Sequence, residues 1–141
     1  INNMRNCQNC TKCCEGHVRA IIKGFKIGNG RPCPFVKIGV GCNIFKDRPT
    51  ECGQWDCQWR KRLDLPEELD PKLTDIVIDV GIDDKHLHAS IMGLKFKEEH
   101  IILLRNYCAE NDIDLTWNFP LTKETYFFGK EERKEHCLSW T

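Results

Sequence analysis

Eight cysteines crowd into the first 57 residues of this 141-residue chain, and they limit its fold more than any other feature. The cluster consists of Cys7, Cys10, Cys13, Cys14, Cys33, Cys42, Cys52 and Cys57. The other two of the ten cysteines, Cys108 and Cys137, stand apart. A disulfide framework would normally spread its bridges across the whole fold, whereas the second half of this chain is nearly free of cysteine. The distribution therefore favours metal ligation, with disulfide pairing as the alternative.

The cysteine spacing is typical of a site in which neighbouring thiolates reach one metal or one cluster. Cys7, Cys10 and Cys13 repeat a C-x2-C pattern, and Cys14 follows directly. Thiolate is a soft ligand that selects zinc, iron–sulfur clusters or copper(I) over magnesium and calcium. Because consecutive residues seldom point at the same atom, we expect Cys13 and Cys14 to serve different metals, or one of them to be structural.

Two metal centres are compatible with this pattern. Eight thiolates divide into two four-cysteine zinc sites, an arrangement that uses every clustered cysteine. A [4Fe–4S] cluster takes four thiolates, often from a C-x2-C-x2-C run and one distant cysteine, and the chain offers that set as well. Glycine and proline predict irregular loop at residues 24–41, which metal ligation would hold in place.

Charge differs between the two halves although the net formal charge is zero. Residues 1–62 carry 12 Lys and Arg against 4 Asp and Glu, a balance of +8, and residues 63–141 carry 9 against 17, a balance of −8. A basic half suits a thiolate-rich centre, and a nucleic-acid face is the alternative reading. Apolar runs fall short of the roughly 18 to 20 residues that span a bilayer, so we expect no membrane association and a cytoplasmic location.

The second half shows the periodicity of regular structure. Alternating apolar residues predict four strands, at 75–80, 86–92, 112–119 and 125–128. An apolar stripe predicts one main helix at 97–110. Pro66 predicts a short helical turn at 65–69 that Asp70 and Pro71 end.

These elements predict an α+β fold in one domain, residues 1–141. An irregular cysteine-rich metal-binding half, residues 1–62, is expected to pack on a small antiparallel sheet with one main helix, residues 63–141. The chain is long enough for one such unit, while two independent domains would each be marginal.

The order of the cysteines and their neighbours resembles the YkgJ-like CxxCxxCC family of zinc- or iron-chelating proteins. The resemblance covers roughly the first 60 residues. It rests on Cys7-x2-Cys10-x2-Cys13-Cys14, Cys33-Pro34-Phe35, Gly41 to Cys52 with Asp47-Arg48-Pro49, and Trp55-Asp56-Cys57. It implies that these cysteines form a metal centre and favours an iron–sulfur cluster over zinc.

Three classes of function follow as hypotheses. The first is a metal-centre protein that acts in redox chemistry, iron handling or the binding of a protein partner. The second is a component of a [4Fe–4S]-dependent methyl or group transfer enzyme, because flagellin lysine N-methylases share the cysteine motif. Those enzymes are much longer, and no Gly-rich nucleotide loop supports this hypothesis here. The third is a zinc-dependent nucleic-acid or protein adaptor, which the basic half would suit.

Other residues that could carry chemistry are better explained structurally. Cys108 lies on the apolar stripe of the predicted helix and is expected in the core. Cys137, beside His136, lacks a visible orienting group for a catalytic pair. His86 and His88 share one side of a predicted strand, where two imidazoles could bind a metal, but a polar strand face is the favoured interpretation.

Residues around the cysteines are expected to support the metal. Asp47 would accept backbone N–H bonds in a turn before Cys52, and Arg48 would neutralise a thiolate, with a substrate site at Asp47-Arg48-Pro49 as the alternative. Aromatic side chains would form an apolar shell that keeps water from the metal, and base stacking is the alternative. These aromatic residues are Phe35, Phe45, Trp55 and Trp59.

Overall fold

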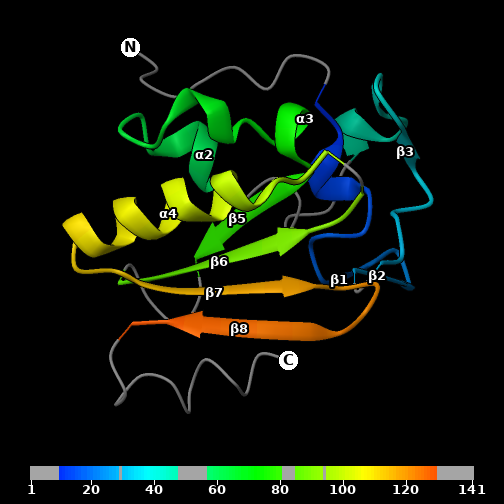
Figure 1. Cartoon of the computed structure of the whole chain (residues 1–141). Coiled ribbons are helices and arrows are strands. Elements are labelled where there is room, and N and C mark those ends of the chain that lie inside the picture. The colour runs from blue at the N-terminus through cyan, green and yellow to red at the C-terminus, as the bar shows by residue number, and fades with distance from the viewer. Residues whose placement is uncertain (1–9, 29, 48–56, 81–84, 94, 130–141) are drawn as a thin grey trace.

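The computed structural model describes residues 10–28, 30–47, 57–80, 85–93 and 95–129. Within these ranges a four-stranded sheet carries the longest helix on one face, and short hairpins and helical turns of the N-terminal half lie beside it (Figure 1). The predicted α+β class is confirmed at this level.

The main sheet contains the four strands that the sequence predicts. They are β5 (Ile76–Val80), β6 (His86–Ile91), β7 (Asp114–Phe119) and β8 (Glu124–Phe128), in the order β5-β6-β7-β8. β5 and β6 form the predicted antiparallel hairpin, with Ile78 opposite Ala89. β7 and β8 are also antiparallel, with Trp117 opposite Tyr126.

The expectation that the sheet is antiparallel throughout is wrong at its centre. β6 and β7 run parallel, with Leu87 opposite Leu115. Parallel neighbours need a crossover connection, and α4 (Glu98–Glu110) provides it by returning the chain along one face of the sheet. The sheet is therefore mixed.

The main core lies between α4 and the sheet. Ile101, Leu104 and Cys108 point from one stripe of the helix into this core, where Leu104 and Cys108 are fully buried. Leu87 and Leu115 meet them from the central strands. Burial raises the pKa of Cys108 to about 12, which keeps its thiol neutral. The predicted core position of Cys108 is confirmed.

Short helical segments connect the two halves. They are α2 (Gln58–Lys61), η3 (Glu67–Leu69) and α3 (Pro71–Thr74). The turn predicted at 65–69 is present as η3, and it ends at Asp70 as predicted. The sequence did not predict that α3 begins directly after it, where the Asp70 carboxylate accepts a hydrogen bond from Lys72 N (2.9 Å) and thereby caps the helix. None of the helices in the described part of the chain is long and apolar enough to cross a membrane.

The N-terminal half is more regular than its glycine content predicts. It contains η1 (Lys12–Cys14), β1 (Ala20–Ile22), β2 (Phe25–Ile27), β3 (Val36–Lys37), β4 (Gly41–Cys42) and η2 (Phe45–Asp47). β1 pairs with β2 and β3 with β4, so the irregular loop predicted at 24–41 is wrong in part. Lys23 and Gly24 both have positive φ, which a two-residue hairpin turn requires. Strands this short leave no periodicity for sequence reasoning to detect.

A second, smaller core belongs to this half. Ile22, Ile27 and Cys33 are buried together, with Phe35 packed against them. The Phe35 ring also meets the Phe25 ring edge-on, at a centroid separation of 5.9 Å. This contact joins the two hairpins. So few buried residues supply little hydrophobic stabilisation, which leaves room for metal ligation to contribute.

Candidate metal centre

Six of the eight clustered cysteines lie in described parts of the chain: Cys10, Cys13, Cys14, Cys33, Cys42 and Cys57. Cys7 and Cys52 lie outside them, as does Cys137. No disulfide joins any cysteine within the described ranges. Cys10 precedes η1, Cys13 and Cys14 lie in it, Cys42 ends β4, and Cys33 and Cys57 lie in the loops before β3 and α2, so the six cysteines come from a long stretch of sequence.

Cys13 and Cys14 form the closest thiol pair. They sit in η1, and their Sγ atoms are 3.9 Å apart. A tetrahedral zinc ion with Zn–S distances of about 2.3 Å places two of its sulfurs roughly 3.8 Å apart. Cys13 and Cys14 were expected to serve different metals, or one of them to be structural; their spacing is also compatible with ligation of one ion by both thiols.

The two thiols of this pair differ in pKa. The hydrogen bond with Cys14, burial, and the charges of Cys14, Cys10 and Cys57 all raise the pKa of Cys13. The same hydrogen bond lowers the pKa of Cys14 to about 7. Cys14 therefore ionises more readily than Cys13. Cys10 and Cys57 lie near enough to act on Cys13, which indicates a local concentration of sulfur that a bound cation would neutralise.

Cys33 and Cys42 lie on the Cys14 side of this pair. Cys33 N donates to Cys14 O at 2.8 Å, and Val36 N donates to Cys33 O at 3.2 Å. Val36 in turn stands opposite Cys42 in the β3–β4 ladder. Burial raises the pKa of Cys33, and the charges of Cys14 and Cys42 add to this effect. Backbone pairing, rather than sequence spacing, places these cysteines near one another.

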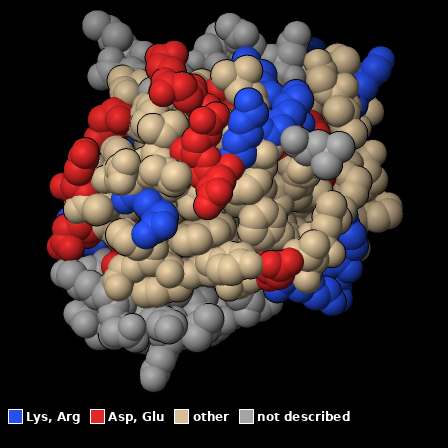
Figure 2. Space-filling model, viewed as in Figure 1, with Lys and Arg blue, Asp and Glu red and all other residues tan. Residues whose placement is uncertain are grey.

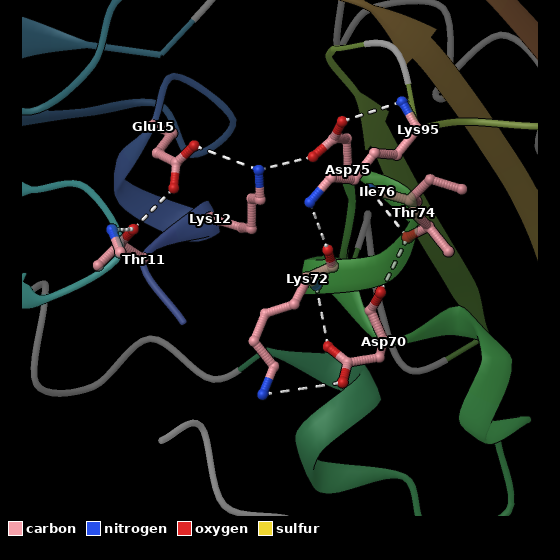
Figure 3. Close-up of polar contacts among 10 residues, drawn as sticks. Thr11, Lys12, Glu15, Asp70, Lys72, Thr74, Asp75, Ile76 and Lys95 are labelled. Carbon is pink, nitrogen blue, oxygen red and sulfur yellow. Dashed lines mark hydrogen bonds and ion pairs between the residues drawn. The ribbon is translucent and has the colours of Figure 1, made fainter. Parts of the chain in front are cut away.

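An ion pair anchors η1 to the sheet half (Figure 3). Lys12 Nζ lies 2.6 Å from Asp75 Oδ1 and 3.4 Å from Glu15 Oε1. Asp75 Oδ2 accepts a further bond from Lys95 N at 3.2 Å. Burial acts to lower the pKa of Lys12, but the bond to Asp75 and the charges of Glu15 and Asp75 raise it overall. The bridge therefore fixes the segment that carries Cys13 and Cys14.

Thr11 ties the same segment to the β3–β4 hairpin. Its hydroxyl donates to Glu15 Oε2 at 2.7 Å and accepts from Gly39 N at 2.9 Å. Sequence reasoning missed Thr11, Lys12 and Asp75 as supporting residues. The position of Lys12 among four cysteines was a signal that it supports the cysteine segment. Nothing in the sequence indicated Asp75 as its partner.

The fit to a metal is incomplete within the described residues. No three of their His, Cys, Asp and Glu side chains are gathered so as to hold a metal ion. The donor chemistry fits a soft metal, and one pair of sulfurs has the spacing of shared ligands. The predicted ligand set includes Cys7 and Cys52, which lie outside the described ranges.

Of the four aromatic residues predicted to form one shell, the two whose side chains the structure describes lie in different clusters. Phe35 packs in the small N-terminal core, whereas Trp59 packs in the main core and donates from its indole nitrogen to Pro66 O at 3.2 Å. The Phe45 side chain and Trp55 lie outside the described residues. Phe35 and Trp59 therefore do not share one shell.

Other predicted supporting residues have mixed outcomes. Asp47 ends η2, while Arg48 and Pro49 fall outside the described ranges. His86 and His88 lie on one face of β6 as expected, and His86 Nε2 is hydrogen-bonded to Thr116 Oγ1 at 2.6 Å.

Surface charge follows the division between the halves. Asp and Glu gather along the edge that α4 and the preceding helical turns form, and Lys and Arg occupy the side where β1, β2 and β3 lie (Figure 2). In the sequence, residues 16–46 contain Lys and Arg but no Asp or Glu. The hairpins that carry Cys33 and Cys42 are therefore set in positive charge, which stabilises thiolates.

Comparison of the chain with protein-family models, with curated proteins and with solved structures finds no match. The residues of the candidate metal centre are therefore what indicates a function. These are a close thiol pair, further thiols around it, a basic surface, and an ion pair that anchors the cysteine segment to the sheet.

Proposed function

We propose that this chain is a cysteine-ligated metal protein whose N-terminal half holds zinc or an iron–sulfur cluster. The observation that carries the proposal is the Cys13–Cys14 pair, whose sulfurs lie 3.9 Å apart with Cys10 and Cys57 close enough to raise the Cys13 pKa. Thiols so arranged repel one another when ionised, and a bound cation removes that penalty.

Two arguments bear on which metal is bound. The sulfur spacing of Cys13 and Cys14 matches one edge of a zinc tetrahedron, which favours zinc at this pair. The resemblance to the YkgJ-like CxxCxxCC family favours an iron–sulfur cluster. A closed four-thiolate zinc ion would supply structural stability, and a cluster would supply electron transfer.

The protein's own contribution is to position the thiolates. The Lys12–Asp75 bridge holds η1 against the sheet half, and the backbone bond from Cys33 N to Cys14 O brings the hairpin region to it. We propose Cys7, Cys10, Cys13, Cys14, Cys33, Cys42, Cys52 and Cys57 as the ligand set. A metal centre held in this way suits redox chemistry, iron handling or presentation of a surface to a protein partner.

Elemental analysis of anaerobically purified protein tests the proposal. Iron with acid-labile sulfide and a brown colour would identify a cluster, whereas a colourless protein with zinc would identify zinc sites. A protein that contains neither metal after anaerobic purification, and takes up neither on reconstitution, would refute metal binding.

Single serine variants test the ligand assignment. Serine replaces a thiolate with a hard, usually protonated hydroxyl, so Cys10→Ser, Cys13→Ser and Cys57→Ser should lower the metal-to-protein ratio sharply. Cys108→Ser is the matched control, since Cys108 is fully buried in the main core and is not one of the proposed ligands. It should keep its metal and lose about 1–3 kcal/mol of stability. Full metal in Cys13→Ser, or lost metal in a folded Cys108→Ser protein, would contradict the assignment.

A further inference from the structure

The sheet face opposite α4 is polar although much of it is buried. Side chains alternate along a strand, so the residues between the core positions of β5, β6 and β7 share this second face. They are Val77, Asp79, His86, His88, Ser90, Asp114, Thr116 and Asn118. His86 is 0%, Thr116 1% and Ser90 4% exposed. These buried polar groups have partners: His86 is hydrogen-bonded to Thr116, and Ser90 to His17 of the N-terminal segment, which offsets the cost of burying them.

A cavity of about 250 Å³ opens on this face. His17, Val18 and Arg19, from the chain before β1, line one side, and Val77, Asp79, His88 and Ser90 of the sheet line the other. The two sheet strands place Asp79 opposite His88 and Val77 opposite Ser90. His17 Nδ1 is hydrogen-bonded to Ser90 Oγ at 3.0 Å, which holds the N-terminal segment across the sheet.

The histidines of this cavity are neutral at pH 7. Burial lowers the pKa of His17 to about 4, and burial together with the charges of His86 and Arg19 lowers the pKa of His88 to about 4. A neutral imidazole offers one N–H donor and one acceptor nitrogen. The effect of Arg19 on His88 also places the guanidinium near this imidazole.

We propose that this cavity binds a small carboxylic acid that carries hydroxyl groups. The Arg19 guanidinium at the exposed rim receives the carboxylate, because Arg presents paired donors that match a carboxylate. His17, His88 and the Asp79 carboxylate receive the hydroxyls. The cavity is smaller than the roughly 300–1,000 Å³ of sites for drug-sized ligands, so its ligand is correspondingly small.

This site is independent of the cysteine centre in its chemistry. Its polar residues come mainly from β5 and β6, and the lining residues that the structure describes include no cysteine. A binding function here would stand whichever metal the N-terminal half holds.

A titration with three matched three-carbon probes tests the proposal. Glycerate carries one carboxylate and two hydroxyls, glycerol lacks the carboxylate, and propionate lacks the hydroxyls. The imidazole nitrogen signals of the full, metal-loaded chain are followed by NMR at neutral pH. Glycerate should shift the His17 and His88 signals saturably, with Kd in roughly the millimolar range, and each of the other probes should bind more weakly.

Arginine variants locate the binding. Arg19→Gln should weaken glycerate binding about tenfold or more, since it removes a charged donor pair. Arg31→Gln is the control, because Arg31 is exposed in the same half but does not line the cavity. Val77→Phe should also reduce binding, by filling the cavity without changing its charge.

Three results would overturn the proposal. The first is the absence of saturable shifts with glycerate at concentrations of about 50 mM. The second is glycerol binding as tightly as glycerate, which would exclude recognition of the carboxylate. The third is equal affinity of the Arg19→Gln and Arg31→Gln proteins, which would place the binding elsewhere.

Discussion

Acidification from pH 7 to about pH 5 should destabilise this protein through His17 and His88. Both imidazoles are held neutral in the fold, with pKa values lowered from 6.5 to about 4. Above the unfolded pKa both states are neutral and the two histidines contribute nothing. As the pH falls below 6.5 the unfolded chain binds protons that the folded chain refuses, so stability falls until the pH reaches about 4.

The groups around each histidine decide how strongly it resists protonation. Asp75 and Glu15 act to raise the pKa of His17, and Lys12 acts to lower it, but burial outweighs all three charges. Around His88 the positive charge of Arg19 and the neighbouring His86 act in the same direction as burial, with Asn118 opposing them and Asp79 opposite in the ladder. Neither site offers enough negative charge to stabilise an imidazolium.

The magnitude follows from the pKa difference. Lowering the pKa from 6.5 to about 4 makes protonation at about pH 5 cost the fold about 2 kcal/mol per histidine, and about 4 kcal/mol for both together. This is a large part of the stability of an ordinary domain. The loss should be visible as a lower urea midpoint at pH 5 than at pH 7, with an unchanged slope.

Acid also protonates metal-bound thiolates, so the measurement compares variants rather than wild type alone. His17→Gln and His88→Gln should each remove about 2 kcal/mol of the difference in unfolding free energy between the two pH values. Between about pH 7 and pH 8 the wild type and both variants should respond alike, because the imidazoles are neutral in both states. Imidazole nitrogen shifts measured by NMR at pH 5 report the neutral form directly. The reasoning fails if those shifts show a protonated His88 in the folded protein, or if both variants keep the full pH dependence.

The remaining predictions concern the anchor, the core and the metal. Lys12→Met leaves the Asp75 carboxylate without its cation and should lower the free energy of unfolding by about 1–3 kcal/mol in urea, and Asp75→Asn added to it should cost less than the sum of the single changes. Leu104→Ala should cost about 2–5 kcal/mol, whereas Ile102→Ala on the same helix, where the side chain is 50% exposed, should cost far less. Strong chelator should open residues 24–41 to protease before α4 is cut, as followed by mass spectrometry of the fragments; unchanged protection of that segment would contradict a metal-dependent fold.

Much of the second half could be read from its sequence because local periodicity reports burial. The stripe of Ile101, Leu104 and Cys108 identified α4, and apolar alternation identified four strands close to their observed bounds. The core position of Cys108 followed from the same stripe. These features depend on neighbours within a few residues, which is why sequence alone was sufficient.

For the cysteine half the sequence predicts a chemistry, metal ligation, which stays a prediction, and it does not predict the arrangement of the thiols. The C-x2-C spacing and the soft character of thiolate point to metal from sequence alone. The contact between Cys13 and Cys14, and the backbone bond from Cys33 to Cys14, depend on how η1 and the hairpins pack. Strands of two or three residues are too short to show a periodicity from which they could be predicted.

Tertiary structure alone decided the features that join distant segments. Either direction of β7 satisfies the same alternation of apolar residues, and the path of α4 across the sheet makes it parallel to β6. Likewise, Lys12 contacts Asp75, which lies 63 positions (75 − 12) further along the chain, and His17 contacts Ser90, which lies 73 positions further along. Local propensity carries no information about such pairs, because closing a long loop is governed by the global packing that brings its ends together.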